Sequence, residues 1–269
     1  MTSRFCIPYR ALFSLPALGL HMSLLLTPCS QATTLTPQQI LAASDAVRNP
    51  DFAFSLINTV TEYRQSTEVD SSRLQVYAKL DNQSGQFRNL VRYLSPARDL
   101  NKLILMNGKT MWFYDPASKA SIRLSPQQRL LGQASNGDVV TVNLARDYLA
   151  KQVSEEKLQD GEKQERQTYK LELEAQNEAA AYQRIVLWVD QQQYRPLKAR
   201  FYSASEKLLK TAFYRRYQVI FGAERATETI IIDGLDSSWI TVMRYSDWRK
   251  QELPESWFQR DYLSSFRAD

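Results

Sequence analysis

The side chains best suited to nucleophilic or metal chemistry are gathered near the start of this chain. Cys6, His21 and Cys29 are both cysteines and the only histidine among 269 residues. They lie in a stretch with a basic start, an apolar middle and the small-residue pattern Ser-Gln-Ala, which is typical of a secretory signal peptide. We therefore expect residues 1–32 to be cleaved off after Ala32. The remaining 237 residues contain neither His nor Cys.

Two alternatives stay open for this leader. The order Leu-Thr-Pro-Cys at residues 26–29 loosely resembles a lipobox, which would make Cys29 a lipid-attachment site, but Pro28 stands where a small residue is usual. An uncleaved membrane anchor is disfavoured, because Pro16, His21 and Pro28 interrupt a run already shorter than the ~20 apolar residues that span a bilayer.

The loss of His and Cys restricts the chemistry of the mature chain. It lacks the usual nucleophile and base systems and the nitrogen and sulfur ligands of zinc sites. It also has no disulfides, so its stability must come from a hydrophobic core. A carboxylate-dependent hydrolase of envelope glycans or lipids stays open, but the acidic residues fall in hydrophilic runs such as 155–156 and 162–165, which are typical of solvated faces. We expect no enzyme, no metal and no cofactor.

The net charge does not indicate a nucleic-acid partner. Removing Arg4 and Arg10 takes the formal charge from +5 to +3. Basic residues alternate with acids, and the pair Arg215-Arg216 is the nearest approach to a basic and aromatic patch. We therefore expect no binding of DNA or RNA.

Turn signals and hydrophobic periodicity indicate a mainly β protein with a few helices. Thr36 and Pro37 are an N-cap and a first helical residue, and they predict a helix that ends before Asn49. The pair Asn107-Gly108 predicts a tight hairpin. A meander of about 10–11 antiparallel strands should curl into an incomplete, half-open barrel within a single domain at residues 33–269. We expect strands at 54–64, 73–80, 86–93, 102–106, 109–114, 168–173, 184–190, 197–202, 208–217, 227–232 and 240–245.

Residues 125–158 interrupt the strand pattern. The segment is loop-like and then has apolar residues at helical spacing, so we predict a helical and loop lid inserted in the domain. Several strands, such as 103–106 and 185–189, are apolar on both faces. Either both faces are packed, or one is left to receive an apolar ligand.

Three segments of the chain resemble the LolA-like outer-membrane lipoprotein-sorting family of bacterial periplasmic proteins. They are Ile-Leu-Ala-Ala-Ser-Asp-Ala-Val-Arg at 40–48, Met-Trp-Phe-Tyr-Asp-Pro at 111–116 followed by Ile-Arg-Leu-Ser at 122–125, and the aromatic and Leu segment at 257–263. The resemblance implies an incomplete β-barrel whose apolar concave face, covered by helices, carries acyl chains of lipoproteins or lipids across the periplasm without catalysis. It also implies acyl chains as ligands, with an inner-membrane exporter or an outer-membrane acceptor as partners of a monomer.

The candidate ligand-binding residues follow from these patterns. Trp112 and Tyr114 share a strand face that could line a cavity, although ordinary core packing is the common role of such residues. Apolar side chains within the polar lid could plug a hydrophobic opening. The full set for the apolar cavity and lid is Leu103, Leu105, Trp112, Tyr114, Leu130, Leu131, Val139, Leu187, Val189, Phe201 and Phe213, and Arg123 and Arg129 could hold the lid or meet a head group.

The sequence thus favours a periplasmic carrier that binds acyl chains in its barrel cavity. The alternative is a periplasmic sensor or interaction module on the same scaffold, which would bind a lipidated or membrane partner without transporting it.

Overall fold

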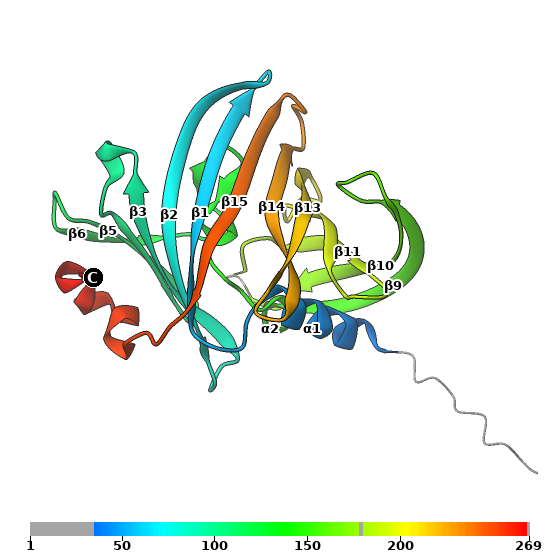
Figure 1. Cartoon of the computed structure of the whole chain (residues 1–269), viewed down its shortest axis with the longest axis horizontal. Coiled ribbons are helices and arrows are strands. Elements are labelled where there is room, and N and C mark those ends of the chain that lie inside the picture. The colour runs from blue at the N-terminus through cyan, green and yellow to red at the C-terminus, as the bar shows by residue number, and fades with distance from the viewer. Residues whose placement is uncertain (1–34, 178–179, 268–269) are drawn as a thin grey trace, which may run out of the picture. The chain divides into compact units, whose positions relative to one another are not determined.

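The computed structural model describes residues 35–177 and 180–267, and the signal-peptide and Cys29 predictions lie outside these ranges. Leu35–Asp269 group together as one compact unit. The unit is built on one antiparallel sheet with the strand order β6-β5-β4-β3-β2-β1-β15-β14-β13-β12-β11-β10-β9 (Figure 1). Its two end strands do not pair, so the sheet curves without closing into a barrel.

Along the chain, a first group of strands runs from the middle of the sheet to one edge, and a second group runs from the other edge back to the middle. The first group is β1 (Phe54–Arg64), β2 (Thr67–Asp81), β3 (Gln86–Ser95), β4 (Leu103–Asn107), β5 (Thr110–Asp115) and β6 (Ala120–Leu124). The second is β9 (Tyr148–Gln159), β10 (Glu165–Ala175), β11 (Arg184–Asp190), β12 (Pro196–Tyr202), β13 (Leu208–Ile220), β14 (Ala223–Asp233) and β15 (Trp239–Lys250). The first and last strands, β1 and β15, pair in the middle of the sheet.

All eleven expected strands are present, and the sheet has two more. The additional strands, β6 and β9, are its two edges. Edge strands carry fewer buried side chains, so their apolar periodicity is weak: β6 has no buried residue, and β9 was expected to be helical. The helix expected late in the lid is correspondingly short, because α2 spans only Leu144–Asp147.

Residues 125–147, between β6 and β9, connect one edge of the open sheet to the other, and we call this connection the lid. It contains a small hairpin of β7 (Arg129–Leu131) and β8 (Ala134–Ser135), the 3-10 turn η2 (Asn136–Asp138) and α2. Gly132 turns the hairpin with φ +55°, and a Cβ there would lie 2.3 Å from the Thr241 hydroxyl of β15. Only glycine lets this hairpin lie so close to the sheet.

Helix α1 (Pro37–Arg48) forms as the sequence predicts. Thr36 and Gln39 make a reciprocal capping box, and Pro37 occupies the first turn, where a missing N–H costs nothing. Ile40 and Leu41 are fully buried, and α1 contacts β9, β14 and α2. Figure 1 shows α1 and α2 together at one end of the sheet.

Each face of the sheet has its own hydrophobic cluster. The face toward the lid and α1, which we call the inner face, includes Ile104 and Met106. The opposite, outer face carries Leu103 and Leu105. Over β3–β5 the outer face is covered by residues 251–267, which include the 3-10 helices η3 (Glu255–Phe258) and η4 (Arg260–Ser265). A further short 3-10 helix, η1 (Ala97–Asp99), joins β3 to β4.

Candidate functional site

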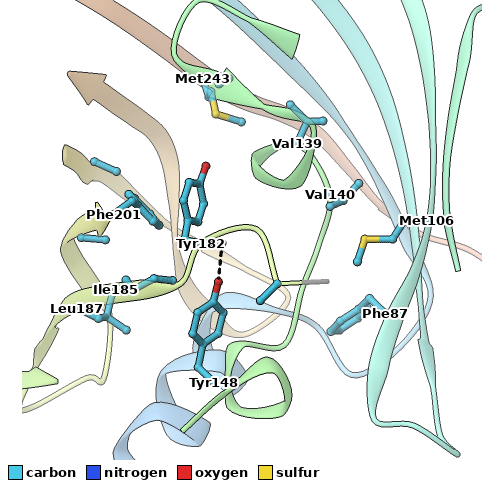
Figure 2. Packing of buried hydrophobic residues seen from close by; sticks show 14 of the residues in the cluster. Phe87, Met106, Val139, Val140, Tyr148, Tyr182, Ile185, Leu187, Phe201 and Met243 are labelled. Carbon is cyan, nitrogen blue, oxygen red and sulfur yellow. Dashed lines mark hydrogen bonds between the residues drawn. The ribbon is translucent and has the colours of Figure 1, made fainter. Parts of the chain in front are cut away.

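A largely apolar cavity lies between the inner face of the sheet and its cover. The volume of this cavity is about 190 Å³. Its apolar lining comes from the sheet (Leu56, Val76, Met106, Ile185, Phe201, Ala212, Ile231 and Met243) and from the cover (Val47, Val139, Val140, Val142 and Leu144). Charged residues also line it, namely Arg48, Asp138, Asp147, Glu224 and Arg225. In Figure 2, Val139 and Val140 of the lid lie between Phe87 and Met106 on one side and Ile185, Leu187 and Phe201 on the other. The lid therefore helps to close the cavity.

Neutral amide groups fasten the lid to β3. The Asn89 carboxamide donates to the Thr141 carbonyl and accepts from the Thr141 N–H, both at 2.8 Å. Gln86 makes the same reciprocal pair with Asn143, at 3.1 and 2.7 Å. Such pairs satisfy buried backbone groups without burying a charge, so this attachment should not depend on pH.

A buried ion pair fastens the lid to β13. The Lys210 ammonium, 3% exposed, donates to the Asp138 carboxylate of η2 and, at 3.0 Å, to the Gln133 carbonyl. Asp138 also accepts from the Tyr182 hydroxyl at 2.9 Å and from the Ser135 N–H at 2.7 Å. Burial lowers the pKa of Lys210 below its usual 10.5, although Asp138 opposes the shift. A buried charge retained with this many partners is costly to leave unpaired.

Tyrosines on the cover and the sheet bring hydroxyls to the cavity. The Tyr148 hydroxyl accepts from the Tyr182 backbone N–H at 3.2 Å (Figure 2), and the Tyr245 hydroxyl donates to Thr229 Oγ1 at 3.3 Å. Burial raises the pKa of Tyr214 to about 12, so its hydroxyl stays protonated at neutral pH. These groups can donate or accept hydrogen bonds but carry no charge.

Two residues that line the cavity each have a buried polar atom without a partner. Asn58 on β1 is 1% exposed, and its Oδ1 makes no hydrogen bond to any described residue. The indole Nε1 of Trp248 on β15 is likewise buried and unpaired within the described part of the chain. An unsatisfied buried group costs about 1–3 kcal/mol, so its retention calls for an explanation.

Charged groups lie where α1 meets the lid. The Asp45 carboxylate, 5% exposed, accepts from Arg48 at 2.6 Å and from the Ala145 N–H at 2.7 Å. Burial raises the pKa of Asp45 above its usual 3.8, against the lowering effect of Arg48. Arg48 also donates to the Val142 carbonyl at 2.6 Å, so α1 and the lid are held as one cover.

Neither a metal site nor a membrane-spanning helix is found in the described ranges. No group of three or more His, Cys, Asp or Glu side chains there is placed to hold a metal ion. None of the helices within residues 35–177 and 180–267 is long and apolar enough to cross a membrane.

Comparison with known proteins identifies the family. A family model described as an uncharacterized protein matches residues 85–265, and no curated protein matches the chain. The crystal structure of a LolA superfamily protein from Nitrosomonas europaea is 34% identical, covering 85% of this chain and all of that one with a TM-score of 0.76. The chain belongs to the LolA superfamily.

Two more distant structures share the LolA fold of this chain. A DUF1329 family protein from Desulfovibrio piger is 21% identical with a TM-score of 0.70, and the alignment covers 84% of this chain and 97% of that one. A putative outer membrane lipoprotein-sorting protein domain from Vibrio parahaemolyticus is 20% identical with a TM-score of 0.67 and the same coverage. At these identities the likeness shows the fold alone.

The LolA-like cavity is lined by two of the residues expected from the sequence, Val139 and Phe201. Leu187 and Val189 belong to the inner core cluster but not to the cavity wall. Leu130 and Leu131 are half-buried against the same cluster.

The other expected residues lie away from the cavity. Leu103, Leu105 and Tyr114 are buried in the outer cluster, with Trp112 packed against it, and Phe213 alternates with the cavity residues Ala212 and Tyr214. Strand side chains alternate between faces, so where both sets are apolar the sequence does not say which set faces inward. Of the two arginines, Arg123 is exposed on β6. Arg129 is also exposed, with its guanidinium carbon 4.4 Å from the Trp239 ring centre.

Sequence reasoning missed the polar residues of the inner face. Asn58 stands between Leu56 and Val60 at alternating positions of β1, so it is a polar residue in the apolar part of that strand face. Lys210 is likewise a polar residue two positions before the buried Ala212, on the same face of β13. A polar residue at an apolar register position was the available signal for both.

Proposed function

We propose that this LolA superfamily protein is a periplasmic carrier that binds acyl chains of lipoproteins or lipids non-covalently and passes them between envelope membranes. The observation that carries the proposal is the largely apolar cavity beneath a lid that joins the two edges of an open sheet. Burying a methylene there is worth about 0.8 kcal/mol, so a chain of ordinary length gains enough to be held without any covalent step.

The family relationship and the leader-like N-terminus support the location. The Vibrio protein with this fold is described as a putative outer membrane lipoprotein-sorting domain. A carrier between membranes needs an entrance, and the lid supplies a movable wall because it is held by a limited set of polar contacts to β3, β13 and α1. An inner-membrane exporter and an outer-membrane acceptor are the partners that such a task requires.

Ala212→Phe tests the proposal by filling the cavity. Ala212 is 2% exposed and lines the cavity, so a phenyl ring there occupies the space of an acyl chain. Phe213→Leu, next to it on the opposite face of β13, is the matched control. Wild type and control, purified without detergent from the periplasm of the native host, should release acylated ligand in native mass spectrometry with lipid extraction, and Ala212→Phe should release none.

Two results would count against the carrier. Ligand retained at wild-type levels by a folded Ala212→Phe variant would place binding elsewhere. No ligand in any sample, after lipids and lipoproteins had been offered, would favour the sensor or interaction module.

A further inference from the structure

The outer face of the sheet has a second half that residues 251–267 do not cover. The 3-10 helix η3 contacts β3 and β4, and η4 contacts β5, at the end of the sheet away from β13 (Figure 1). On β13 and β14, Phe213 and Ile230 face outward, because each alternates with residues that line the cavity. Both side chains are only half-buried. Within the described ranges, this half of the outer face thus has an apolar centre without a helical cover.

Three cations surround the Trp188 ring on one side of this centre. Lys170 and Lys198 lie opposite Trp188 on the two neighbouring strands, with their ammonium nitrogens 5.7 and 4.9 Å from the ring centre. The guanidinium carbon of Arg200 lies 5.6 Å from the same ring. Lys170 has the Glu156 carboxylate at 3.8 Å. Neither Lys198 nor Arg200 makes an ion pair with any residue of the described ranges.

The cations around Trp188 repel one another. Burial lowers the pKa of Lys198 below its usual 10.5, and the positive charges of Arg200 and Lys170 lower it further. The more distant Glu156 only opposes this shift. Attraction to the indole ring stabilises each cation separately but does not remove the repulsion between them. An anion placed among the three would do so.

A second group of cations surrounds Glu228, two residues along β14 from Ile230. The Nε atoms of Arg215, Arg216 and Arg244 lie 3.1, 3.3 and 3.0 Å from the Glu228 carboxylate. Glu228 is buried, whereas the side chains of Arg216 and Arg244 are 58% and 46% exposed. One carboxylate neutralises one of three guanidiniums, so positive charge remains at the surface here too.

Other acids on this face do not cancel the excess. Glu172 and Glu206 both pair with Arg184, at 3.0 and 2.6 Å. The unpaired cations Lys198 and Arg200 and the shared arginines around Glu228 therefore leave the face basic. We call this surface, from β10 to β15, the basic outer face.

Charge complementarity selects the occupant of the basic outer face. A second copy of this chain would bring two positive surfaces together. An anionic lipid surface offers many phosphate groups without a fixed arrangement, which suits cations spread over several strands rather than gathered in one cleft. Long lysine and arginine side chains reach such phosphates while apolar neighbours, here Phe213 and Ile230, contact the boundary of the acyl region.

We propose that the basic outer face docks this protein on an anionic lipid bilayer, with the cations around Trp188 and Glu228 contacting lipid phosphate groups. The inference goes beyond the carrier proposal, because it concerns the side of the sheet opposite the cavity. Docking through the outer face leaves the lid and α1, which lie on the inner face, free of the membrane contact.

Vesicle co-sedimentation of the full mature chain tests the docking. The two probes are vesicles of phosphatidylcholine alone and vesicles of phosphatidylcholine and phosphatidylglycerol in equal parts. At about 0.1 M NaCl we expect at least roughly tenfold tighter binding to the anionic vesicles, since each cation near such a surface contributes to affinity. At about 1 M NaCl the preference should disappear, because the Debye length falls to about 3 Å.

Variants assign the binding to the basic outer face. Replacing both unpaired cations, Lys198→Gln with Arg200→Gln, should weaken binding to anionic vesicles roughly twenty-five-fold, or about fivefold for each charge. The matched control, Lys109→Gln with Lys119→Gln, removes two exposed lysines from turns in the other half of the sheet and should bind as the wild type does.

Two further variants separate charge from folding. The exchange Lys198→Arg with Arg200→Lys keeps both charges and should keep the binding. Arg216→Gln changes a largely exposed side chain and should weaken binding about fivefold, so it tests the face even if the double variant does not fold. Melting temperatures of all variants check that they are folded.

The outcomes distinguish this inference from its alternatives. Equal binding to both kinds of vesicle, or equal losses in the double variant and its lysine control, would overturn docking through this face. Binding of poly-L-glutamate without binding of vesicles would replace the bilayer by an acidic protein, and a dimer in sedimentation velocity that the double variant loses would replace it by a second copy. Acyl ligand released by a protein that ignores vesicles would overturn the docking alone, and docking without any acyl ligand would overturn the carrier alone.

Discussion

The two faces of β3–β5 are both buried, but their covers differ. On the outer face, residues 251–267 insert Leu253, Phe258, Leu263 and Phe266 into a cluster with Leu103 and Leu105. On the inner face, Ile104 and Met106 face the lid, and Met106 lines a cavity. The outer cover fills its space with the chain's own aromatic rings, and the inner cover does not.

The difference shows how a structural surface can be told from a binding surface in this fold. Apolar residues on both faces of a strand require only that both faces be covered. What distinguishes the inner face is the cavity beneath its cover, since polar contacts hold both covers to the sheet. Three predictions test this contrast, beginning with the largest expected effect.

Truncating the outer cover should reduce stability without affecting binding. Phe258 is fully buried, and its carbonyl accepts from Asn107 at 2.9 Å. Phe258→Ala should lower the free energy of unfolding by about 4 kcal/mol, because it removes buried area and leaves a cavity. Urea unfolding measures the loss, and Ser264→Ala on the exposed side of η4 is the control. If the folded variant bound a fluorescent fatty-acid analogue more weakly than the wild type, the outer cover would be shown to affect binding at the inner face.

Breaking the ion pair under the lid should loosen the inner cover. Lys210→Met leaves the Asp138 carboxylate without its buried cation, at a cost of about 3 kcal/mol. Hydrogen exchange of lid amides such as that of Ser135 should accelerate roughly a hundredfold, while amides of η4 keep their rates. Lys207 is an exposed lysine nearby in the chain, and Lys207→Met should change neither the stability nor the exchange rates of the lid amides. Equal acceleration in lid and η4 would show global rather than local opening.

The two covers should respond to acid in opposite directions. The pKa of Asp45, in the inner cover, is raised by burial, so the folded state keeps its proton at higher pH than the unfolded state. The contribution of Asp45 to the free energy of unfolding therefore rises as the pH falls from neutral toward 3.8. The pKa of Glu255, in the outer cover, lies below its usual 4.5 because Lys79 and Arg88 donate to it, and this contribution is lost as the pH falls through the lowered value.

Unfolding free energies measured from pH 7 to about pH 4 check these signs. The difference between wild type and Asp45→Asn should increase on acidification. The difference between wild type and Glu255→Gln should decrease, by at most about 1 kcal/mol for so exposed a pair. If both stability differences changed in the same direction on acidification, the expected contrast between the two covers would be wrong.

Much of the fold was predictable because local signals agree with it. The capping box at Thr36 and Gln39 fixes the start of α1, and Asn107-Gly108 turns β4 into β5. The edge strands escaped prediction because β6 has no buried residue, and β9 continues into the largely polar residues 154–159, none of which is buried. Among the site residues, Val139 was predictable as an apolar side chain in a polar segment, whereas Trp112 and Tyr114 were expected on the wrong face.

The amino-acid sequence by itself determined where the strands and α1 form, since propensity, capping and turn chemistry act over a few residues. It also placed a lid between two strand-rich halves. Only the tertiary structure decided which face of β4 and β5 points inward, because that depends on the return of residues 251–267 to the outer face. It alone left Asn58 Oδ1 and Trp248 Nε1 buried without partners among the described residues, because hydrogen-bond partners far apart in sequence are set by how β1 and β15 meet.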